Sequence, residues 1–234
     1  MNSINPSLWK SLPSPEDIFR AELENGVIVL SRSNFDCPSV VINGYLLCGS
    51  QSDSDEKLGL ADFTALTLMR GSQRRTFQEI YDALESVGAT LSLGASVHTT
   101  SFGGRSLVED LPLLLGLLSE CIRHPVFLPE QVEKVRAQLL TALAIRAQDT
   151  SEMASLTFDR LLFKDHPYGR PEDGYPDSIQ AITRADLEAF HRQHYGPSGM
   201  VIVVVGGVTP EAVIEMVSGS LGEWRNPLQP QPPL

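Results

Sequence analysis

The segment that most limits the fold is Ala89–Leu107, ATLSLGASVHTTSFGGRSL. It is rich in Thr, Ser and Val, and it therefore predicts the two strands of a β-hairpin. The strands of a hairpin pair antiparallel, so a sheet that contains this segment cannot be entirely parallel. Helical and strand patterns alternate along the rest of the chain. The sequence thus predicts an α+β fold, in which one mixed β-sheet is covered by helices mainly on one face.

Other strands are predicted where β-branched and apolar residues dominate. These segments are Gly26–Ser31, Ser39–Gly49 and Met200–Val208. The last, MVIVVVGGV, is almost purely apolar, and we expect it to be buried on both faces of the sheet. Within the hairpin, the pair Gly103–Gly104 is expected to mark an irregularity in its strand. The turn-rich segment His166–Ser178 is predicted to be a loop.

Helices are predicted where apolar residues recur at helical spacing and capping residues flank the pattern. Thr76 and Glu79 are spaced as a capping box, and Gly88 is suited to end that helix. Thr209 and Pro210 likewise suit the start of the last helix. The predicted helical regions are Asp53–Gly71, 76–88, Leu111–Arg123, Pro129–Arg146, Glu152–Phe163, Thr183–His194 and 210–221.

The chain has 234 residues, of which 42% are hydrophobic, so it can bury a substantial core. We expect a lead-in segment at 1–21, a single domain at 22–224, and a Pro-rich tail at 225–234. The tail, which ends NPLQPQPPL, resembles a linker to an absent second domain. The net charge is -11 and the pI is about 4.9, which disfavours binding to nucleic acid.

The sequence also carries hints about the compartment. No apolar run reaches transmembrane length, and the start, MNSINPSLWKSLPSPEDIF, lacks the basic and apolar regions of a signal peptide. The cysteines Cys37, Cys48 and Cys121 are odd in number and widely spaced, so we expect buried thiols instead of disulfides or a zinc cluster. These features predict the cytoplasm or another reducing, soluble compartment.

Four longer segments stand out together: ENGVIVL, GLADFTALTLMRGSQRRTFQEIYDALESVGATL, EDLPLLLGLLSECIRHPVF and HPYGRPEDGYPDSIQAITRADLEAFHRQHYGPSGMVIVVVGGV. They resemble the pitrilysin/insulinase (M16) metallopeptidase family, which includes the mitochondrial processing peptidase and the core subunits of respiratory complex III. The resemblance covers about residues 22–224 and is most specific over 166–208. It implies an N-terminal-type M16 domain with the metallohydrolase fold of LuxS and the mitochondrial processing peptidase.

In active members of that family, the helix that corresponds to Gly59–Ser72 carries the zinc motif His-x-x-Glu-His. Its two histidines bind Zn²⁺, its glutamate activates the bound water, and a glutamate from a downstream helix completes the site. The resemblance places these positions at Asp62, Ala65 and Leu66, and the downstream position at Ala142. The motif is degenerate, so we expect no catalytic residue and no metal in this chain. Asp62 would complement its helix dipole, and Ala65 and Leu66 would fill the space of the lost site.

Other candidate residues give weaker signals. His191 and His194 have a metal-like i, i+3 spacing, but they lie at a helix end and no third ligand is evident. His98 lies in the hairpin and is expected to face solvent or a cleft. Ser101 and Ser106 have no identifiable His and acid partners, so the sequence does not support a serine hydrolase.

The resemblance also implies a way of binding peptides. Members of the family pair an extended substrate with an edge strand, which here begins at about Leu91. The matching positions are Ser92, Leu93 and Gly94. Active members usually have Asn-Ala where Ser92-Leu93 stands, so this strand is altered as well. An ordinary hairpin strand is an equally good interpretation.

Three functional hypotheses follow from the resemblance. In the first, the chain is a non-catalytic subunit that pairs with a zinc-bearing M16 homologue, or with a second domain of the same architecture, and helps to form a peptide-binding chamber. Zinc is then expected in the catalytic partner, and an unfolded peptide is a candidate ligand. In the second, the chain is a structural or assembly subunit, like the core proteins of complex III. The third, an active zinc endopeptidase with unrecognised ligands, is disfavoured by the lost motif.

Overall fold

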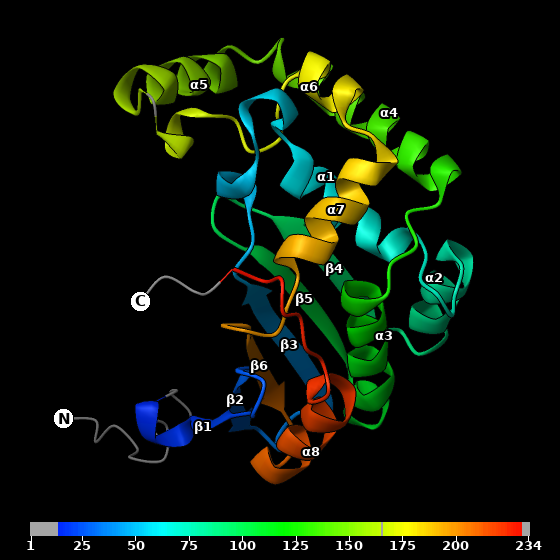
Figure 1. The fold of residues 1–234 in the computed structure, drawn as a ribbon. Helices are drawn as coiled ribbons and strands as arrows, with labels where there is room; N and C mark the ends of the chain where they lie inside the picture. The colour runs from blue at the N-terminus through cyan, green and yellow to red at the C-terminus, as the bar shows by residue number, and fades with distance from the viewer. Residues whose placement is uncertain (1–13, 165, 231–234) are drawn as a thin grey trace, which may run out of the picture.

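The computed structural model describes residues 14–164 and 166–230, and its central element is one six-stranded sheet (Figure 1). The strand order is β1-β2-β6-β3-β5-β4. β2 and β6 are parallel, and the other neighbours are antiparallel. The prediction of a mixed sheet with an antiparallel hairpin is therefore confirmed. The strands are β1 Phe19–Glu22, β2 Ile28–Ser33, β3 Ser39–Leu46, β4 Thr90–Ala95, β5 Thr100–Leu107 and β6 Val201–Gly206.

The helices that pack on this sheet lie on one of its faces, in front of the strands in Figure 1. α8 packs against β2, α3 against β5, and both α1 and α2 against β4. The expected α+β architecture is confirmed. The α-helices of the described chain are α1 Leu60–Thr67, α2 Phe77–Ser86, α3 Leu111–Arg123, α4 Pro129–Arg146, α5 Thr150–Leu162, α6 Pro176–Ala181, α7 Arg184–His194 and α8 Pro210–Leu221.

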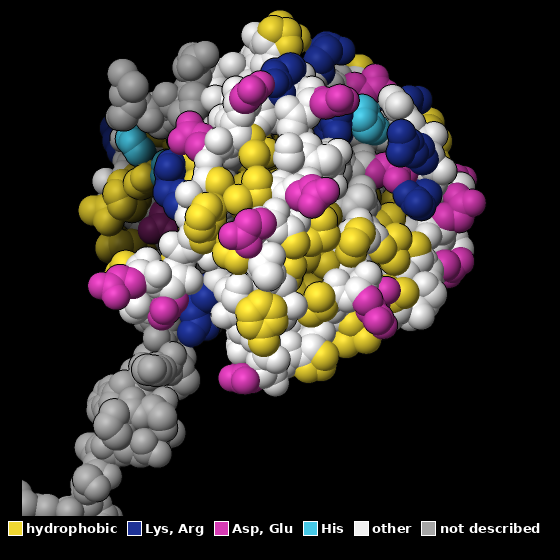
Figure 2. Space-filling view, turned by 90° about the horizontal axis from the view of Figure 1, so that it is seen from below, with side chains coloured by type: hydrophobic (Ala, Val, Ile, Leu, Met, Phe, Trp, Pro, Cys, Tyr) yellow, Lys and Arg dark blue, Asp and Glu magenta, His cyan; other side chains and the backbone are white. Residues whose placement is uncertain are grey.

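The last strand, β6, is buried on one face only. Its residues alternate between buried and half-buried, with Ile202 and Val204 fully buried. The prediction of burial on both faces is therefore wrong. The reason is that helices cover a single face of the sheet, and Val41 and Tyr45 of the neighbouring β3 are 42% and 38% exposed. Seen from below, the molecule shows hydrophobic side chains gathered across its surface, with single acidic side chains between them (Figure 2).

The helical region that was expected at Asp53–Gly71 begins later than predicted. Two 3₁₀ turns precede α1, and a third follows it. Asp53 is buried, and its carboxylate accepts hydrogen bonds from the backbone N–H groups of Gly59 (2.9 Å) and Ala61 (3.0 Å). Gly59 has φ 92°, a left-handed conformation that glycine adopts without strain. Asp53 therefore caps the helix from six residues upstream, which places the start of α1 at Leu60.

The predicted caps of the other helices are confirmed. Thr76 and Glu79 form the reciprocal capping box of α2, and Gly88 follows its end with φ 63°. The side chain of Thr209 accepts a hydrogen bond from Ala212 at the start of α8. These short-range signals depend on neighbouring residues alone, which explains why they could be recognised without the fold.

Several local predictions are wrong. The lead-in segment at 1–21 contains the start of β1, and its first thirteen residues lie outside the described part. The loop expected at His166–Ser178 contains a 3₁₀ turn and the first turn of α6. Gly103–Gly104 lies in a regular ladder with β3 and β4, and a side chain at Gly104 would meet the Thr90 carbonyl oxygen at 2.5 Å. Close backbone approach, not an irregular strand, explains this glycine.

The expected tail at 225–234 packs against the domain over its described part, 225–230. Asn226 donates hydrogen bonds to the backbone carbonyls of Arg192 (2.9 Å) and Tyr195 (2.7 Å). Gln229 bonds both the N–H and the carbonyl of Ser198. This part of the tail is therefore fixed at the end of the sheet. Residues 231–234 lie outside the described part.

Candidate functional site

The three degenerate motif positions lie on α1, a short helix that packs against β4, α4 and α7. The predicted helix is therefore present, but its three positions do not share one environment. Asp62 is half-buried, Ala65 is 1% exposed, and Leu66 is 37% exposed. Of the two residues that were predicted to fill the space of a lost metal site, only Ala65 is buried, and the prediction itself stays untested. Leu66 faces outward because it lies about 100° further around the helix than its neighbour.

The downstream position, Ala142, is exposed on α4. α4 packs against α1, as the resemblance implies, but through its buried residues, among them Leu139 and Leu143. Ala142 directly precedes the buried Leu143 and lies on a different face of the helix. Of the four positions that the resemblance assigns to the zinc motif, Ala65 is buried, Asp62 is half-buried, and Leu66 and Ala142 are exposed.

Asp62 lies in a cleft of about 380 Å³ that contains further acidic side chains. The pKa of Asp62 is raised from 3.8 to about 6, chiefly by burial and also by the nearby charges of Asp173 and Glu172, while a backbone hydrogen bond from Ala95 opposes the rise. Its position early in α1 also suits a carboxylate, as predicted. The Asp62 carboxyl is thus poised to bind a proton near neutral pH.

The acidic character of this cleft was not predicted. Glu152 at the start of α5, together with Glu172 and Asp173 from the following loop, lines the same space as Asp62. Arg146, at the end of α4, forms an ion pair with Asp173 and donates a hydrogen bond to the Gly174 carbonyl at 3.0 Å. The adjacent acids Glu172 and Asp173 are visible in the sequence. Their proximity to Asp62 could not be predicted, because they are far from it along the chain.

This donor set does not fit the zinc ion that the family resemblance implies. A zinc site needs three protein ligands, usually His, Cys or carboxylate. Within the part of the chain that the structure describes, no group of three or more His, Cys, Asp or Glu side chains could hold a metal ion. At the motif positions, Asp62 alone offers a donor atom, because Ala65, Leu66 and Ala142 have hydrocarbon side chains.

The histidine candidates serve the packing of the domain. His191 is half-buried, its Nε2 lies 2.8 Å from the Ile122 carbonyl oxygen, and its ring stacks on Tyr195. Burial lowers the pKa of both His191 and His194. His98 lies between Gln51 and Tyr168, with ring nitrogens 2.9 Å and 2.8 Å from their side-chain oxygens. The hydrogen bonds of His191 and His98 link separate segments of the fold.

β4, the strand predicted to bind an extended peptide, lies at the edge of the sheet, where a further strand can be added. β4 is the last strand of the sheet, so one edge of its backbone is unpaired within the described structure. Ser92, Leu93 and Gly94 line a shallow cavity of about 480 Å³, together with residues of β3 and β5. The Ser92 hydroxyl donates a hydrogen bond to the Gly103 carbonyl (3.3 Å). Peptide binding itself stays a prediction.

The cysteines are only partly as expected. Cys48 and Cys121 are buried free thiols, whereas Cys37 is exposed. The Cys37 sulfur lies 2.9 Å from the Ser39 hydroxyl, and this contact lowers the pKa of the thiol. The prediction of burial is wrong for Cys37 because the turn that carries it lies at the rim of the sheet, before β3.

Two family models match the chain. One, described as "Insulinase (Peptidase family M16)", matches residues 28–171, and the other, described as "Peptidase M16 inactive domain", matches residues 181–234. An uncharacterized zinc protease of Mycobacterium tuberculosis is 27% identical over 216 residues, which are 91% of this chain and 49% of that protein. No described helix is long and apolar enough to cross a membrane.

Further relatives, among them a solved structure, are also M16 peptidases or processing peptidases. A probable mitochondrial-processing peptidase subunit beta of Arabidopsis thaliana is 27% identical over 195 residues, 83% of this chain and 37% of that protein. Among solved structures, a peptidase M16 inactive domain from Pseudomonas fluorescens superimposes with a TM-score of 0.84 at 26% identity, over 93% of this chain and 52% of that one. The chain spans about half the length, or less, of the curated relatives that it matches.

Proposed function

This chain belongs to the insulinase (M16) peptidase family, and from that premise we propose that it is a non-catalytic part of a two-part peptidase. It pairs with a zinc-bearing M16 homologue, or with a second domain of the same architecture, and helps to form the peptide-binding chamber. The partner supplies the zinc and the general base. This chain forms part of the wall of the chamber, and the free edge of its β4 contacts an extended peptide.

One observation supports this proposal above the others: the chain has an M16-type fold, but the helix that the resemblance aligns with the zinc motif lacks the donors for zinc chemistry. That helix, α1, is packed into the domain, but Ala65 offers no carboxylate and Leu66 no imidazole. The edge strand β4 is retained next to this helix. A scaffold that keeps its peptide edge without its catalytic groups suits a binding role better than a hydrolytic one.

A purely structural role is the alternative, as in the core proteins of complex III that the resemblance includes. It would need the scaffold and the pairing surface, but not the edge of β4. A zinc endopeptidase with other ligands remains the third hypothesis, and it would need a donor set that the described residues do not form.

The proposal is tested by mixing purified components. Cleavage of unstructured peptides is measured for this chain, for a zinc-bearing M16 homologue from the same source, and for their mixture. We expect no activity from this chain alone, activity from the mixture, and much less from the homologue alone. Equal rates for the homologue alone and for the mixture would exclude the helper role.

A second measurement separates the peptide-binding role from the structural one. Replacing Leu93 in β4 by Pro removes one backbone N–H and blocks strand addition at the edge. If the chain grips peptides, this variant should still assemble with its partner but raise the KM of the mixture. Unchanged KM would favour the structural role. Metal analysis after dialysis tests the third hypothesis, since about one Zn²⁺ per chain would revive it.

A further inference from the structure

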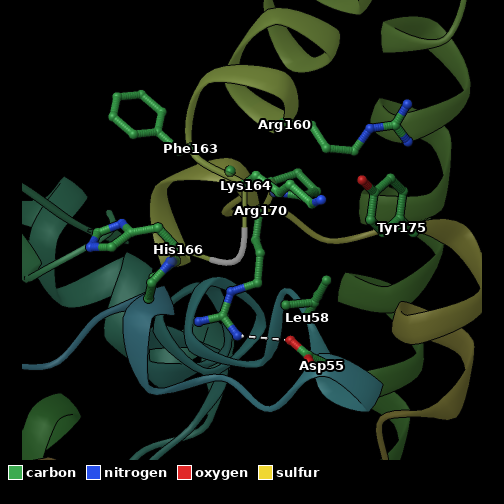
Figure 3. Close-up of a pocket in the computed structure, with 11 residues that line it drawn as sticks. Asp55, Leu58, Arg160, Phe163, Lys164, His166, Arg170 and Tyr175 are labelled. Atoms are coloured by element: carbon green, nitrogen blue, oxygen red, sulfur yellow. Dashed lines mark hydrogen bonds and ion pairs between the residues drawn. The ribbon is translucent and has the colours of Figure 1, made fainter.

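A second cavity, of about 570 Å³, lies beyond the acidic cleft, between the end of α5 and the turns that precede α1 (Figure 3). Its lining includes Arg160, Lys164 and Arg170, together with a single described carboxylate, that of Asp55. Three cations around one hollow are unusual in a chain with a net charge of -11. The charge of this cavity is therefore opposite to that of the molecule and of the neighbouring acidic cleft.

Two of the three cations have no acidic partner among residues 14–164 and 166–230. Arg160 at the end of α5 and Lys164 just after it form no ion pair with any residue that the structure describes, and both are exposed. Figure 3 shows both side chains extending toward Tyr175 at one side of the cavity. Cations at the C-terminal end of a helix complement its dipole, which is a second explanation for the positions of Arg160 and Lys164 at the end of α5. It does not explain the position of Arg170, which lies in the loop beyond.

Arg170 is held in place from the opposite side. Its guanidinium forms an ion pair with Asp55 at 2.9 Å and donates to the backbone carbonyl of Asp53 at 3.2 Å. Its Nε is buried and has no acceptor among the described residues. Its side chain is only 25% exposed. Figure 3 shows the Arg170 guanidinium directed at Asp55, so Arg170 gives the wall of the cavity a fixed positive charge that Asp55 partly offsets.

The walls between the charges are apolar and aromatic. Leu58 and Pro171 line the cavity, and Tyr175 adds a ring and a hydroxyl, whereas the Phe163 ring packs against Tyr168. Figure 3 shows the His166 ring turned away from the three cations, so it is not counted among the charges. The described lining residues carry a net charge of about two positive units at neutral pH, from three cations and Asp55. That charge matches a phosphate monoester, which is close to a dianion at pH 7.

We propose that this cavity binds a small phosphate monoester with an apolar or aromatic ring. The phosphate lies at Arg160 and Lys164, which extend to the same side of the cavity, and Arg170 adds positive charge from the opposite wall. The ring lies against Leu58 and Tyr175. The site is distinct from the acidic cleft around Asp62, although Pro171 borders both. It requires no metal and no catalytic role, and it does not depend on the pairing proposed above.

Isothermal titration calorimetry with the full chain tests this proposal, with phenyl phosphate as the probe. The double variant Arg160→Gln/Lys164→Gln should bind phenyl phosphate at least tenfold more weakly. The matched control Lys134→Gln/Arg192→Gln removes the same charge from exposed positions outside the cavity and should bind as the native chain does. All four side chains are exposed, so folding should be unaffected.

A gain of affinity provides a test that misfolding cannot imitate. Asp55→Asn removes the one described carboxylate of the cavity and frees Arg170, so it should tighten binding of phenyl phosphate about threefold to tenfold. Equal weakening in both double variants, or weaker binding by Asp55→Asn, would overturn the proposal. So would inorganic phosphate that binds as tightly as phenyl phosphate, or a Glu-rich peptide that competes more strongly than either.

Discussion

Helices α1 and α5 have opposite relations to the core. Five of the eight residues of α1 are buried, whereas none of the thirteen residues of α5 is. α1 packs against β4, α4 and α7, while the main neighbour of α5 is the short turn that follows it, and α5 lies apart from the sheet in Figure 1. The helix that the resemblance aligns with the zinc motif is therefore part of the core, whereas α5 is not.

The difference sets what a substitution on each helix should cost. On α1 packing limits the size and polarity of side chains such as Ala65. On α5 no side chain is buried, and the helix brings charge to its ends. Glu152 at its start enters the acidic cleft, and Arg160 near its end enters the cationic cavity. One helix thereby supplies opposite charges to two adjacent hollows.

The largest effect is expected when Ala65, which the resemblance aligns with the glutamate of the zinc motif, is replaced by glutamate. This side chain is 1% exposed, and Ala65→Glu would bury a carboxyl group without a partner. We expect a loss of about 3 kcal/mol or more in the free energy of unfolding. For a domain of this size the melting temperature should fall by roughly 6–12 °C. Differential scanning calorimetry measures both quantities.

The control lies one residue further along the same helix. Leu66 is 37% exposed, so Leu66→Glu should cost less than about 1 kcal/mol. If the two variants melt together, α1 does not have the buried and exposed faces described here, and its contrast with α5 loses its basis.

The next largest effect concerns the start of α1. Asp53 accepts hydrogen bonds from two backbone N–H groups, at Gly59 and Ala61. Asp53→Ala leaves both donors unmet in a buried setting, and we expect a loss of about 2 kcal/mol. Urea unfolding followed by circular dichroism should show it as a lower midpoint with an unchanged slope.

The matched variant is Asp149→Ala at the N-cap of α5, which removes hydrogen bonds to Ser151 (2.8 Å) and Glu152 (3.1 Å). Because α5 is exposed, its start can be solvated by water, and the cost should stay below about 1 kcal/mol. A greater loss at Asp149 than at Asp53 would reverse the ranking of the two helices.

The same contrast separates what the sequence could predict from what it could not. The periodicity of apolar residues and the capping residues at Thr76 and Thr209 are local signals, and they predicted α2 and α8 correctly. Asp53 was assigned to the helix itself, because its capping role depends on a chain reversal over six residues. The sheet type could be predicted from one hairpin, but the one-sided burial of β6 depends on where the helices pack.

The resemblance located Asp62, Ala65 and Leu66 on one helix, and the structure places all three on α1. Their correspondence to the zinc motif stays a prediction. Which of them face the core could not be read from a short motif, since it depends on how α1 is turned against β4 and α4. The acidic cleft and the cationic cavity arise from residues more than eighty positions apart in the chain, Asp62 with Glu152 and Asp55 with Arg160.

A smaller effect is expected from the acidic cleft, through its dependence on pH. The pKa of Asp62 rises from 3.8 to about 6 in the folded state, so the folded chain binds a proton more tightly than the unfolded chain does. Asp62 therefore adds stability below about pH 4, and this contribution is lost as the pH rises toward 6. Asp62→Asn removes the charge, and at pH 7.5 it should be more stable than the native chain by about 1 kcal/mol.

Chemical unfolding at pH 4.5 and pH 7.5 measures this difference for both proteins. Asp173→Asn is not a suitable substitute, because Asp173 also pairs with Arg146. If Asp62→Asn is less stable than the native chain at pH 7.5, the Asp62 carboxylate is stabilised by its surroundings, and α1 tolerates charge as well as α5 does.

The smallest effect is expected on α5 itself. Leu161 and Leu162 are 74% and 58% exposed, so the double variant Leu161→Ala/Leu162→Ala removes little buried area. We expect a change below about 0.5 kcal/mol, because surface substitutions away from caps and ion pairs seldom exceed this. The matched core variant Leu143→Ala, at a residue that is 3% exposed, should cost about 2–5 kcal/mol. Thermal melts of the two variants, made at several protein concentrations, give both values. A loss above about 1 kcal/mol in the α5 variant that depends on concentration would mean that α5 is buried in an oligomer. The contrast between α1 and α5 would then hold only for the separate chain.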